Sequence, residues 1–231
     1  MLSTAPSQTD TPTRVVAPAA ARRGVPLWAA ILLAAIAGGL LDLSFPAVGW
    51  WPLTFVSIIL ALCTIIRRSI GGAFLVGAAF GAAFYFIHLV WVGTYLGPVP
   101  WVALAGLEAV LFGVGAIPLA LAYRWTDRAR GHVILWFVGV PLLVAGLWTV
   151  RELVMGSWPY SGFPWARIGM TQANGPLPEA ASWVGVTGLS FLIVAACASL
   201  VQWWRAGGLR RMAGLLPCLL YTSDAADEED S

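Results

Sequence analysis

Six long apolar runs, separated by short connections, constrain the fold of this chain more than any other feature of its sequence. They cover approximately residues 26–43, 51–66, 70–92, 100–123, 133–154 and 181–204. Most of them reach the length of about 20 residues that a helix needs to cross a bilayer. Only 10% of the residues are charged, against about 25% in a typical soluble domain. The sequence therefore predicts an all-α, polytopic transmembrane helix bundle with six full spans and a truncated seventh that begins near Met212.

The basic residues predict how the bundle is oriented. All thirteen of them are arginines, and eleven precede the first run or follow the second, fourth and sixth runs, at positions 14, 22, 23, 67, 68, 124, 128, 130, 205, 210 and 211. Because basic residues are retained on the cytoplasmic side, we expect these ends and the N-terminus to lie in the cytoplasm. No basic face interleaved with aromatic residues is evident, so nucleic-acid binding is not expected.

The two ends of the chain differ in composition from the bundle. Residues 1–21 are rich in Ser, Thr, Pro and Ala, which predicts a disordered cytoplasmic tail. The following arginine pair and apolar run could be a signal peptide. We favour an uncleaved anchor, because more runs follow and no small-residue cleavage site closes this one. The bundle is expected over residues 22–220. Residues 221–231, with five of the eleven acidic residues, are interpreted as a truncated or unrelated end, with a natural acidic tail as the alternative.

The segment at 157–177, SWPYSGFPWARIGMTQANGPL, fits neither a spanning helix nor an ordinary polar loop. Its prolines exclude one straight helix. Its four aromatic residues favour the water–lipid boundary, and Arg167 is its only charge. Irregular backbone beside a membrane has to be buried in protein or to line a wet cavity. The segment follows the fifth run, so we expect it to face outward and to handle substrate.

Ionisable residues inside the runs are candidates for buried interactions. Glu108 would cost about 2.5–3.5 kcal/mol if charged and unpaired at the bilayer centre, so we expect it to face the bundle or a wet cavity; a protonated or interface-near carboxyl is the alternative. For His88, a hydrogen-bonded interior side chain is favoured over a proton relay. Glu152 could orient a lipid headgroup, but a structural partnership with Arg167 is favoured. Arg151 and Glu152 are sequence neighbours on different helix faces, and no pairing is assumed.

The motifs of soluble enzymes are not present in this sequence. It has no Gly-rich phosphate loop and no nucleophile elbow, and its two histidines, His88 and His132, lie in different elements and lack metal spacing. The three cysteines lack metal or redox spacing and are interpreted as small apolar residues, so neither a metal nor a cofactor is expected. Gly77 and Gly81 in the third run, with Gly113 in the fourth, predict close helix packing. No inverted repeat is evident, which counts against a transporter.

Several short motifs resemble the membrane part of the bacterial apolipoprotein N-acyltransferase family. They are GFPW at 162–165, Gly169, Gln172, GPL at 175–177, GV at 185–186 and FL at 191–192. Further matches are SFP at 44–46, WWPL at 50–53 and Trp91, so that the resemblance covers about residues 26–215. One departure is Met155, at a position where the family often has an arginine; Arg151 or Arg167 could substitute for it.

The resemblance implies a bundle of about eight spans that carries an outward-facing nitrilase-like domain between the last two. Such an enzyme, in the bacterial inner membrane, transfers an acyl chain from a phospholipid donor to the N-terminal cysteine amine of a diacylated lipoprotein. Its Glu-Lys-Cys set acts through a thioester in the nitrilase-like domain. We expect none of that set in this chain, which lacks lysine. No catalytic residue is therefore assigned, and the chain alone is expected to be inactive.

The candidate site residues lie at the outward end of the fifth and sixth runs. Trp165, Phe163 and Gln172 are expected to contribute to an outer lipid-access surface, and Glu152 and Arg167 are further candidates. The alternative is that the GFPW turn only packs the ends of the two runs. Two other functions stay open, a small-solute transporter and a non-catalytic lipid-binding scaffold.

Overall fold

The computed structural model describes residues 25–127, 132–159 and 161–207, and this part of the chain contains helices and no strand. The α-helices are α1 (Leu27–Leu43), α2 (Leu53–Ile65), α3 (Ile70–His88), α4 (Val90–Leu96), α5 (Pro98–Thr126), α6 (Val140–Met155) and α7 (Ala180–Arg205). A π-helical turn, η2 (Leu135–Gly139), leads into α6. Two 3-10 segments, η3 (Pro164–Ala166) and η4 (Ile168–Asn174), lie between α6 and α7. The all-α prediction is confirmed.

Four of the described helices are long and apolar enough to cross a membrane, namely α3, α5, the continuous stretch Leu135–Met155, and α7. The helices α1 and α2 have 17 and 13 residues, which correspond to about 25 and 20 Å, less than the ~30 Å hydrocarbon core. Six full spans are therefore not confirmed. The second run is shortened because its helix starts only after Pro52, and Arg67 has a positive φ of 64° beyond its end. The seventh run and the expected tails at 1–21 and 221–231 lie outside the described residues.

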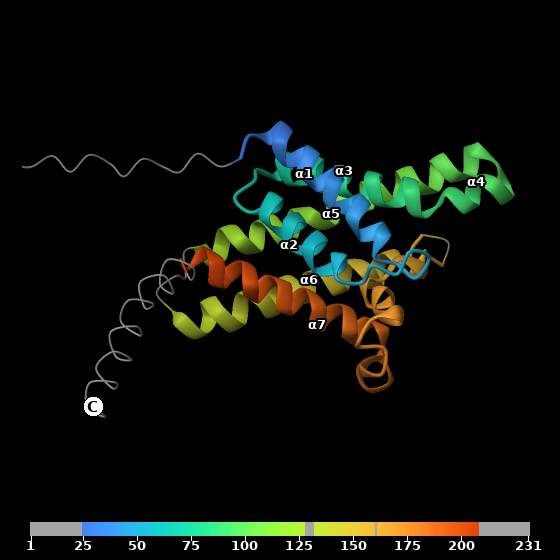
Figure 1. Ribbon diagram of the computed structural model, residues 1–231. Helices are drawn as coiled ribbons and strands as arrows, with labels where there is room; N and C mark the ends of the chain where they lie inside the picture. The colour runs from blue at the N-terminus through green and yellow to red at the C-terminus, as the bar shows by residue number, and fades with distance from the viewer. Residues whose placement is uncertain (1–24, 128–131, 160, 208–231) are drawn as a thin grey trace, which may run out of the picture.

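The third run is divided into two helices. Helix α3 ends at His88, because Leu89 has a ψ of 12° and interrupts the helical backbone. The short α4 follows, and Gly97 reverses the chain into α5 with a φ of 90°. Helix α4 and the first turns of α5 form a hairpin that reaches farther than the other elements at this end of the bundle (Figure 1).

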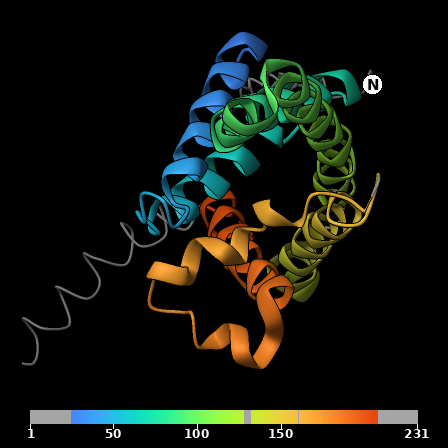
Figure 2. The ribbon, with the colours of Figure 1, turned by 90° about the vertical axis from the view of Figure 1, so that its right-hand side faces the viewer.

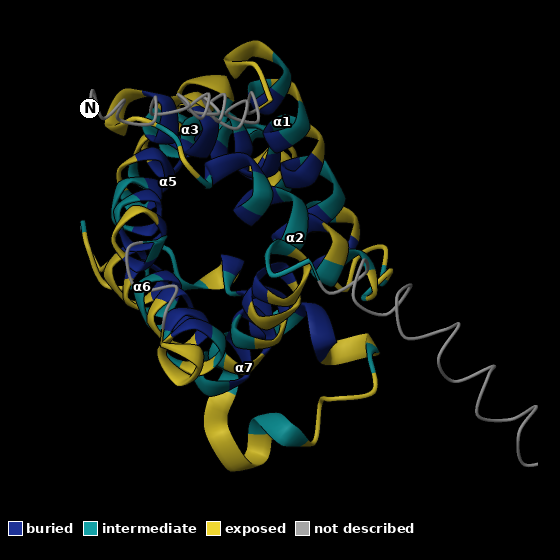
Figure 3. Ribbon diagram, turned by 90° about the vertical axis from the view of Figure 1, so that its left-hand side faces the viewer, coloured by how far each residue is buried: buried dark blue, intermediate teal, exposed yellow. Residues whose placement is uncertain are grey.

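Helix α3 lies between α1 and α5, while α6 packs against α5 and α7, and α2 packs against α1 and α7. Seen along the bundle, the helices stand in a ring (Figure 2), with their buried residues on the inner side (Figure 3). The contact between α3 and α5 depends on small residues. An added Cβ at Gly77 would lie 2.5 Å from the Cβ of Ala116, and one at Gly81 would lie 2.8 Å from the Cβ of Phe112. Close packing of these two helices, predicted from their glycines, is confirmed.

The arginine-rich connections gather at one end of the bundle. Arg68 donates a hydrogen bond of 2.7 Å to the carbonyl oxygen of Val25, which joins the α2–α3 connection to the start of α1. Arg205 pairs with Asp127, which joins the end of α7 to the end of α5. The irregular segment between α6 and α7 lies at the opposite end (Figure 1). This segregation agrees with the arginine pattern from which the topology was predicted.

Candidate functional site

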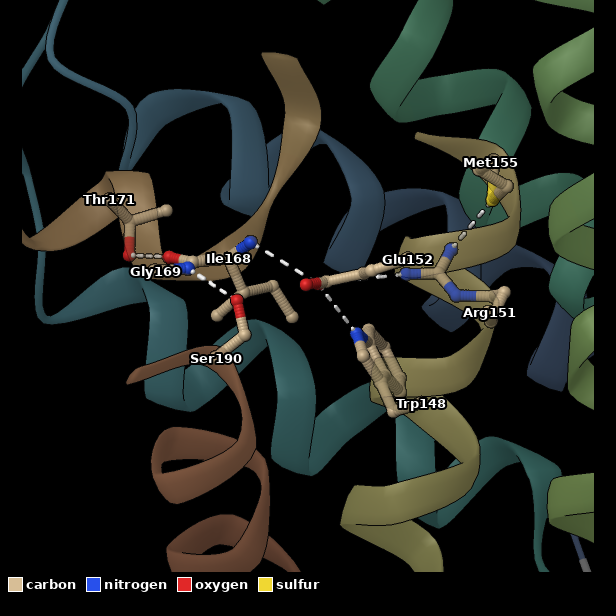
Figure 4. A network of polar contacts seen from close by, with 8 residues as sticks. All are labelled: Trp148, Arg151, Glu152, Met155, Ile168, Gly169, Thr171 and Ser190. Carbon is tan, nitrogen blue, oxygen red and sulfur yellow. Dashed lines mark hydrogen bonds and ion pairs between the residues drawn. The ribbon is translucent and has the colours of Figure 1, made fainter. Parts of the chain in front are cut away.

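The carboxylate of Glu152 connects α6 to the irregular segment that follows it. Its side chain is 3% exposed. The oxygen Oε1 accepts hydrogen bonds from Nε1 of Trp148, at 3.1 Å, and from the backbone nitrogen of Ile168, at 3.2 Å (Figure 4). One donor lies a helical turn earlier on α6, and the other lies at the start of η4. The carboxylate therefore fixes where the irregular segment meets the bundle.

Arg151 is the buried cation of this site, with 8% of its surface exposed. Its Nη2 lies 3.9 Å from Oε1 of Glu152, so these sequence neighbours form a long ion pair although no pairing was assumed. Its Nη1 lies 3.6 Å from the sulfur of Met155. The guanidinium carbon lies 3.8 Å from the ring centroid of Phe112 and 4.8 Å from that of Trp148. Two aromatic faces and one carboxylate thus stabilise the charge.

Residues of α3 and α5 complete the surroundings of Arg151. Gly115 leaves room for the arginine stem, because a Cβ at this position would lie 2.5 Å from Cδ of Arg151. Tyr85 of α3 and Glu108 of α5 both interact electrostatically with Arg151. Glu108 is 1% exposed, so the expectation that it faces the bundle is confirmed. Since isolated charges are costly inside a membrane, the cluster combines carboxylates and a guanidinium from two spanning helices.

A small cavity lies beside these groups, lined by Tyr85, Arg151, Glu152, Met155, Phe163, Ala166 and Arg167. Its volume is about 10 Å³, about enough for a single water molecule and far too little for a phospholipid headgroup. Three buried polar atoms of the lining have no hydrogen-bond partner within the described residues: Nε of Arg151, Oε2 of Glu152 and Nε of Arg167. In this arrangement the charged groups contact one another and the irregular segment, and they do not form an open anion-binding site.

Hydrogen bonds to α7 hold the other side of the irregular segment. Arg167 donates from Nη1 to the hydroxyl of Thr187 at 3.1 Å, and does not reach Glu152. The backbone nitrogen of Gly169 donates to Oγ of Ser190 at 2.9 Å. The two chains approach closely here, because a Cβ at Gly169 would lie only 2.4 Å from the carbonyl oxygen of Val186. The direct Glu152–Arg167 partnership that the sequence favoured is therefore replaced by separate contacts, of Glu152 to Trp148 and Ile168 and of Arg167 to Thr187.

Three stacked aromatic rings cover the irregular segment at the end of the bundle. The ring of Trp165 lies 6.1 Å from that of Trp91, with an interplanar angle of 28°, and 6.4 Å from that of Phe163, with an angle of 21°. Trp165 is 63% exposed and Trp91 is 43% exposed, while Phe163 is half-buried. We call these three residues the aromatic ledge.

Gln172 lies beneath the surface. Its side chain is 0% exposed, and its Nε2 donates to the hydroxyl of Thr171 at 3.2 Å. The expectation that Gln172 contributes to an outer surface is therefore wrong. The physical reason is that η4 packs against α7, and that Thr171 and Gln172, consecutive residues of this segment, are both buried.

Sequence reasoning missed two residues that organise the site. Trp148 is completely buried and donates to Glu152; its position four residues before Glu152, on the same helix face, was an available signal. Ser190 lies in an apolar helix, and no local pattern identifies it as the partner of Gly169.

An aspartate–histidine pair joins α1 and α3 near the same end of the bundle. Nδ1 of His88 lies 2.9 Å from Oδ1 of Asp42, and the imidazole stacks on the ring of Phe84 at 4.9 Å. The hydrogen-bonded interior histidine that the sequence favoured is confirmed.

The fold and this site define a polytopic helical membrane protein in which an irregular aromatic segment closes one end of the bundle. Residues 37–199 match the family model described as the apolipoprotein N-acyltransferase N-terminal domain. The chain belongs to this family.

Curated relatives named apolipoprotein N-acyltransferase agree with this assignment. The chain is 34% identical to that of Geobacter metallireducens over 169 residues, which cover 71% of this chain and 32% of the relative. It is 35% identical to that of Mycolicibacterium smegmatis over 202 residues, 80% of this chain and 32% of the relative. The protein of Shewanella oneidensis is 32% identical over 202 residues, which cover 85% of this chain and 38% of the relative. The chain thus spans about a third of the length of the relatives it matches.

Proposed function

We propose that this chain is the membrane part of an enzyme that transfers an acyl chain from a phospholipid to the N-terminal cysteine amine of a diacylated lipoprotein. The observation that carries the proposal is the aromatic ledge, an exposed and stacked set of rings inside the region that matches the family. Trp165 and Phe163 are assigned to contact with the lipid of the donor or the acceptor. Rings of this kind favour the boundary between headgroups and acyl chains.

The groups beneath the ledge are assigned to positioning. Glu152 holds the start of η4 through the backbone nitrogen of Ile168, and Arg167 holds the same stretch to α7 through Thr187. Buried Gln172 lies within η4 and donates to Thr171 of the same segment. Because Trp165 lies three residues before Ile168, these contacts fix the orientation of its ring. A ledge fixed in advance loses less conformational entropy when a lipid binds.

The acyl-transfer chemistry is assigned to residues outside this chain. A Glu-Lys-Cys set requires a lysine, and the chain has none. Cys197 is buried in α7 and Cys63 is half-buried in α2, so neither is placed to form a thioester with a lipid at the ledge. We propose that the chain alone is inactive.

The bundle is proposed to comprise residues 22–220. Residues 1–21 are proposed to be a cytoplasmic tail, and residues 221–231 to be a truncated or unrelated end.

The ledge is proposed to face outward across the bacterial inner membrane, with the N-terminus in the cytoplasm. The arginine-rich connections support this topology, since they lie at the end of the bundle opposite the ledge.

A chimera tests the proposed function. Residues 1–205 of this chain would be joined to the part of the Mycolicibacterium smegmatis relative that follows the matching position. Purified chimera, intact relative and this chain alone would be incubated with phospholipid and a synthetic diacylated lipopeptide, and the mass of the lipopeptide measured. We expect acylated product from the chimera and the relative and none from the chain alone. A folded, membrane-inserted chimera without activity would reject the function, and product from the chain alone would reject its inactivity.

A further inference from the structure

Helix α5, which forms one arm of the α4–α5 hairpin, is longer than a simple crossing of the bilayer requires. Helix α5 has 29 residues, about 43 Å, whereas the hydrocarbon core is about 30 Å thick. Its C-terminal end is fixed at the arginine-rich end of the bundle by the pair between Asp127 and Arg205. Arg124 and Trp125 near this end are exposed, so most of the excess of about 13 Å lies beyond the hydrocarbon at the arginine-rich end, and the start of α5 lies near the opposite hydrocarbon boundary. Figure 2 shows the hairpin pointing toward the viewer.

This hairpin carries no charge. The sequence contains no Asp, Glu, Lys or Arg between Ser69 and Leu107. The tip instead exposes large side chains: Tyr95 is 80% exposed, Val99 is 77% exposed and Leu96 is 66% exposed. A patch of this kind is unfavourable in water and favourable at the boundary between headgroups and acyl chains.

The hairpin is also fixed to the bundle. Nε1 of Trp101 donates to the carbonyl oxygen of Phe86 at 3.3 Å, and the two rings pack edge to face at 5.6 Å. Gly93 of α4 also lies beside Trp101 of α5, since a Cβ there would be in van der Waals contact with the indole at 3.6 Å. These contacts hold the exposed side chains of the tip at a defined height above the rest of the bundle.

We propose that the α4–α5 hairpin is a membrane-embedded arm whose tip contacts phospholipid acyl chains just below the headgroups of the leaflet on this side. Trp91 belongs to both α4 and the aromatic ledge, where it stacks on Trp165. The arm and the ledge therefore form one continuous lipid-contacting surface, which extends from the end of the bundle into the leaflet. The occupant is lipid because the uncharged tip continues the lipid-facing surface of α5. This inference concerns the depth of the folded chain and stands apart from acyl transfer.

Spin labels on the full chain measure this depth. In a background with Cys63, Cys197 and Cys218 replaced by alanine, single labels would be placed at Val99→Cys and, as references, at Val110→Cys and Glu179→Cys. Val99 and Val110 are exposed on the same helix, about 16 Å apart along its axis, roughly the half-thickness of the hydrocarbon core. The chain would be reconstituted in phospholipid nanodiscs, and label accessibility to oxygen and to a water-soluble nickel chelate measured.

We expect the label at Val99 to be several-fold less accessible to nickel than the label at Glu179, and to lie within about 5–10 Å of the phosphates. The label at Val110 should lie near the bilayer centre. Nickel accessibility at Val99 equal to that at Glu179 would place the tip in water and overturn the proposal. Spin–spin broadening would show that a second copy covers the tip and would also overturn it. Leu96→Cys, at the end of α4, provides a second label that has to give the same depth.

Discussion

The oxygen Oε1 of Glu152 lies 3.2 Å from the backbone nitrogen of Ile168 and links α6 directly to the irregular segment. The same oxygen accepts from Trp148, whose ring also faces the guanidinium of Arg151. One buried carboxylate therefore satisfies a backbone donor, an indole donor and a cation at once. We expect removal of any of these partners to affect the position of the aromatic ledge as well as the stability of the bundle.

Replacement of Glu152 separates the hydrogen-bonding role from the charge. In Glu152→Ala, the Ile168 N–H and the Trp148 Nε1–H both lose a buried acceptor, and we expect a loss of about 1–3 kcal/mol in stability. Glu152→Gln keeps an acceptor oxygen and should lose less. Thermal unfolding of the chain in detergent, followed by tryptophan fluorescence, measures both. Glu179→Ala, at an exposed position, is the control. Equal losses for the two Glu152 variants would contradict the acceptor role.

Arg151→Lys tests the aromatic contacts of the cation. Lysine keeps the charge, but it cannot stack a planar guanidinium against Phe112 or Trp148. We expect a loss of about 1–2 kcal/mol, in the range of a desolvated cation–π contact. Unfolding midpoints of the variant and of Arg124→Lys, at an exposed position on α5, would be compared. If the Arg151 and Arg124 variants unfold at the same temperature, the stacking does not contribute to stability.

A matched pair of glycine substitutions tests the close contact of α3 and α5. Gly77→Ala places a methyl group 2.5 Å from the Cβ of Ala116, and overpacking of this kind costs about 1–3 kcal/mol. Gly106→Ala meets nothing within 4 Å and should be neutral or stabilising by up to about 1 kcal/mol, since alanine favours the helix. Differential scanning calorimetry of the two variants measures the difference. An unchanged Gly77→Ala would show that the helices can separate without loss.

Trp165→Ala tests the function of the ledge in the active chimera. The variant loses its stack with Trp91 and its contact with lipid. An aromatic pair contributes about 0.5–1.5 kcal/mol beyond the apolar area that it buries. We therefore expect the rate of acyl transfer to fall by roughly tenfold. The amount of folded protein in the membrane should fall much less. Trp28→Ala is the control, because Trp28 is 67% exposed at the arginine-rich end. Equal losses of activity and folded protein would favour the packing interpretation of the GFPW turn.

Much of the architecture follows from the sequence alone. The apolar runs predict the all-α bundle and the approximate position of each helix, because the transfer of a helix into lipid depends on the summed hydrophobicity of its own residues. The prolines and aromatic residues of 157–177 predict an irregular end segment for an equally local reason, since proline cannot continue a helix. The GFPW turn and its neighbours also indicate the family to which the chain belongs.

Other features depend on which helices meet. The sequence around Leu89 contains no proline or glycine that would end a helix, yet α3 ends there. The separate helix α4 that follows forms the hairpin with α5. Gln172 was expected at an outer surface, and only the folded structure shows that its side chain is buried. Arg151 and Glu152 are neighbours with no expected contact, and their interaction becomes evident only when Phe112 of α5 and Ile168 of η4 are in place. Hydrophobicity and backbone restrictions act within a few residues, whereas the pairing of buried polar groups is decided by residues far apart in the chain that the tertiary structure brings together.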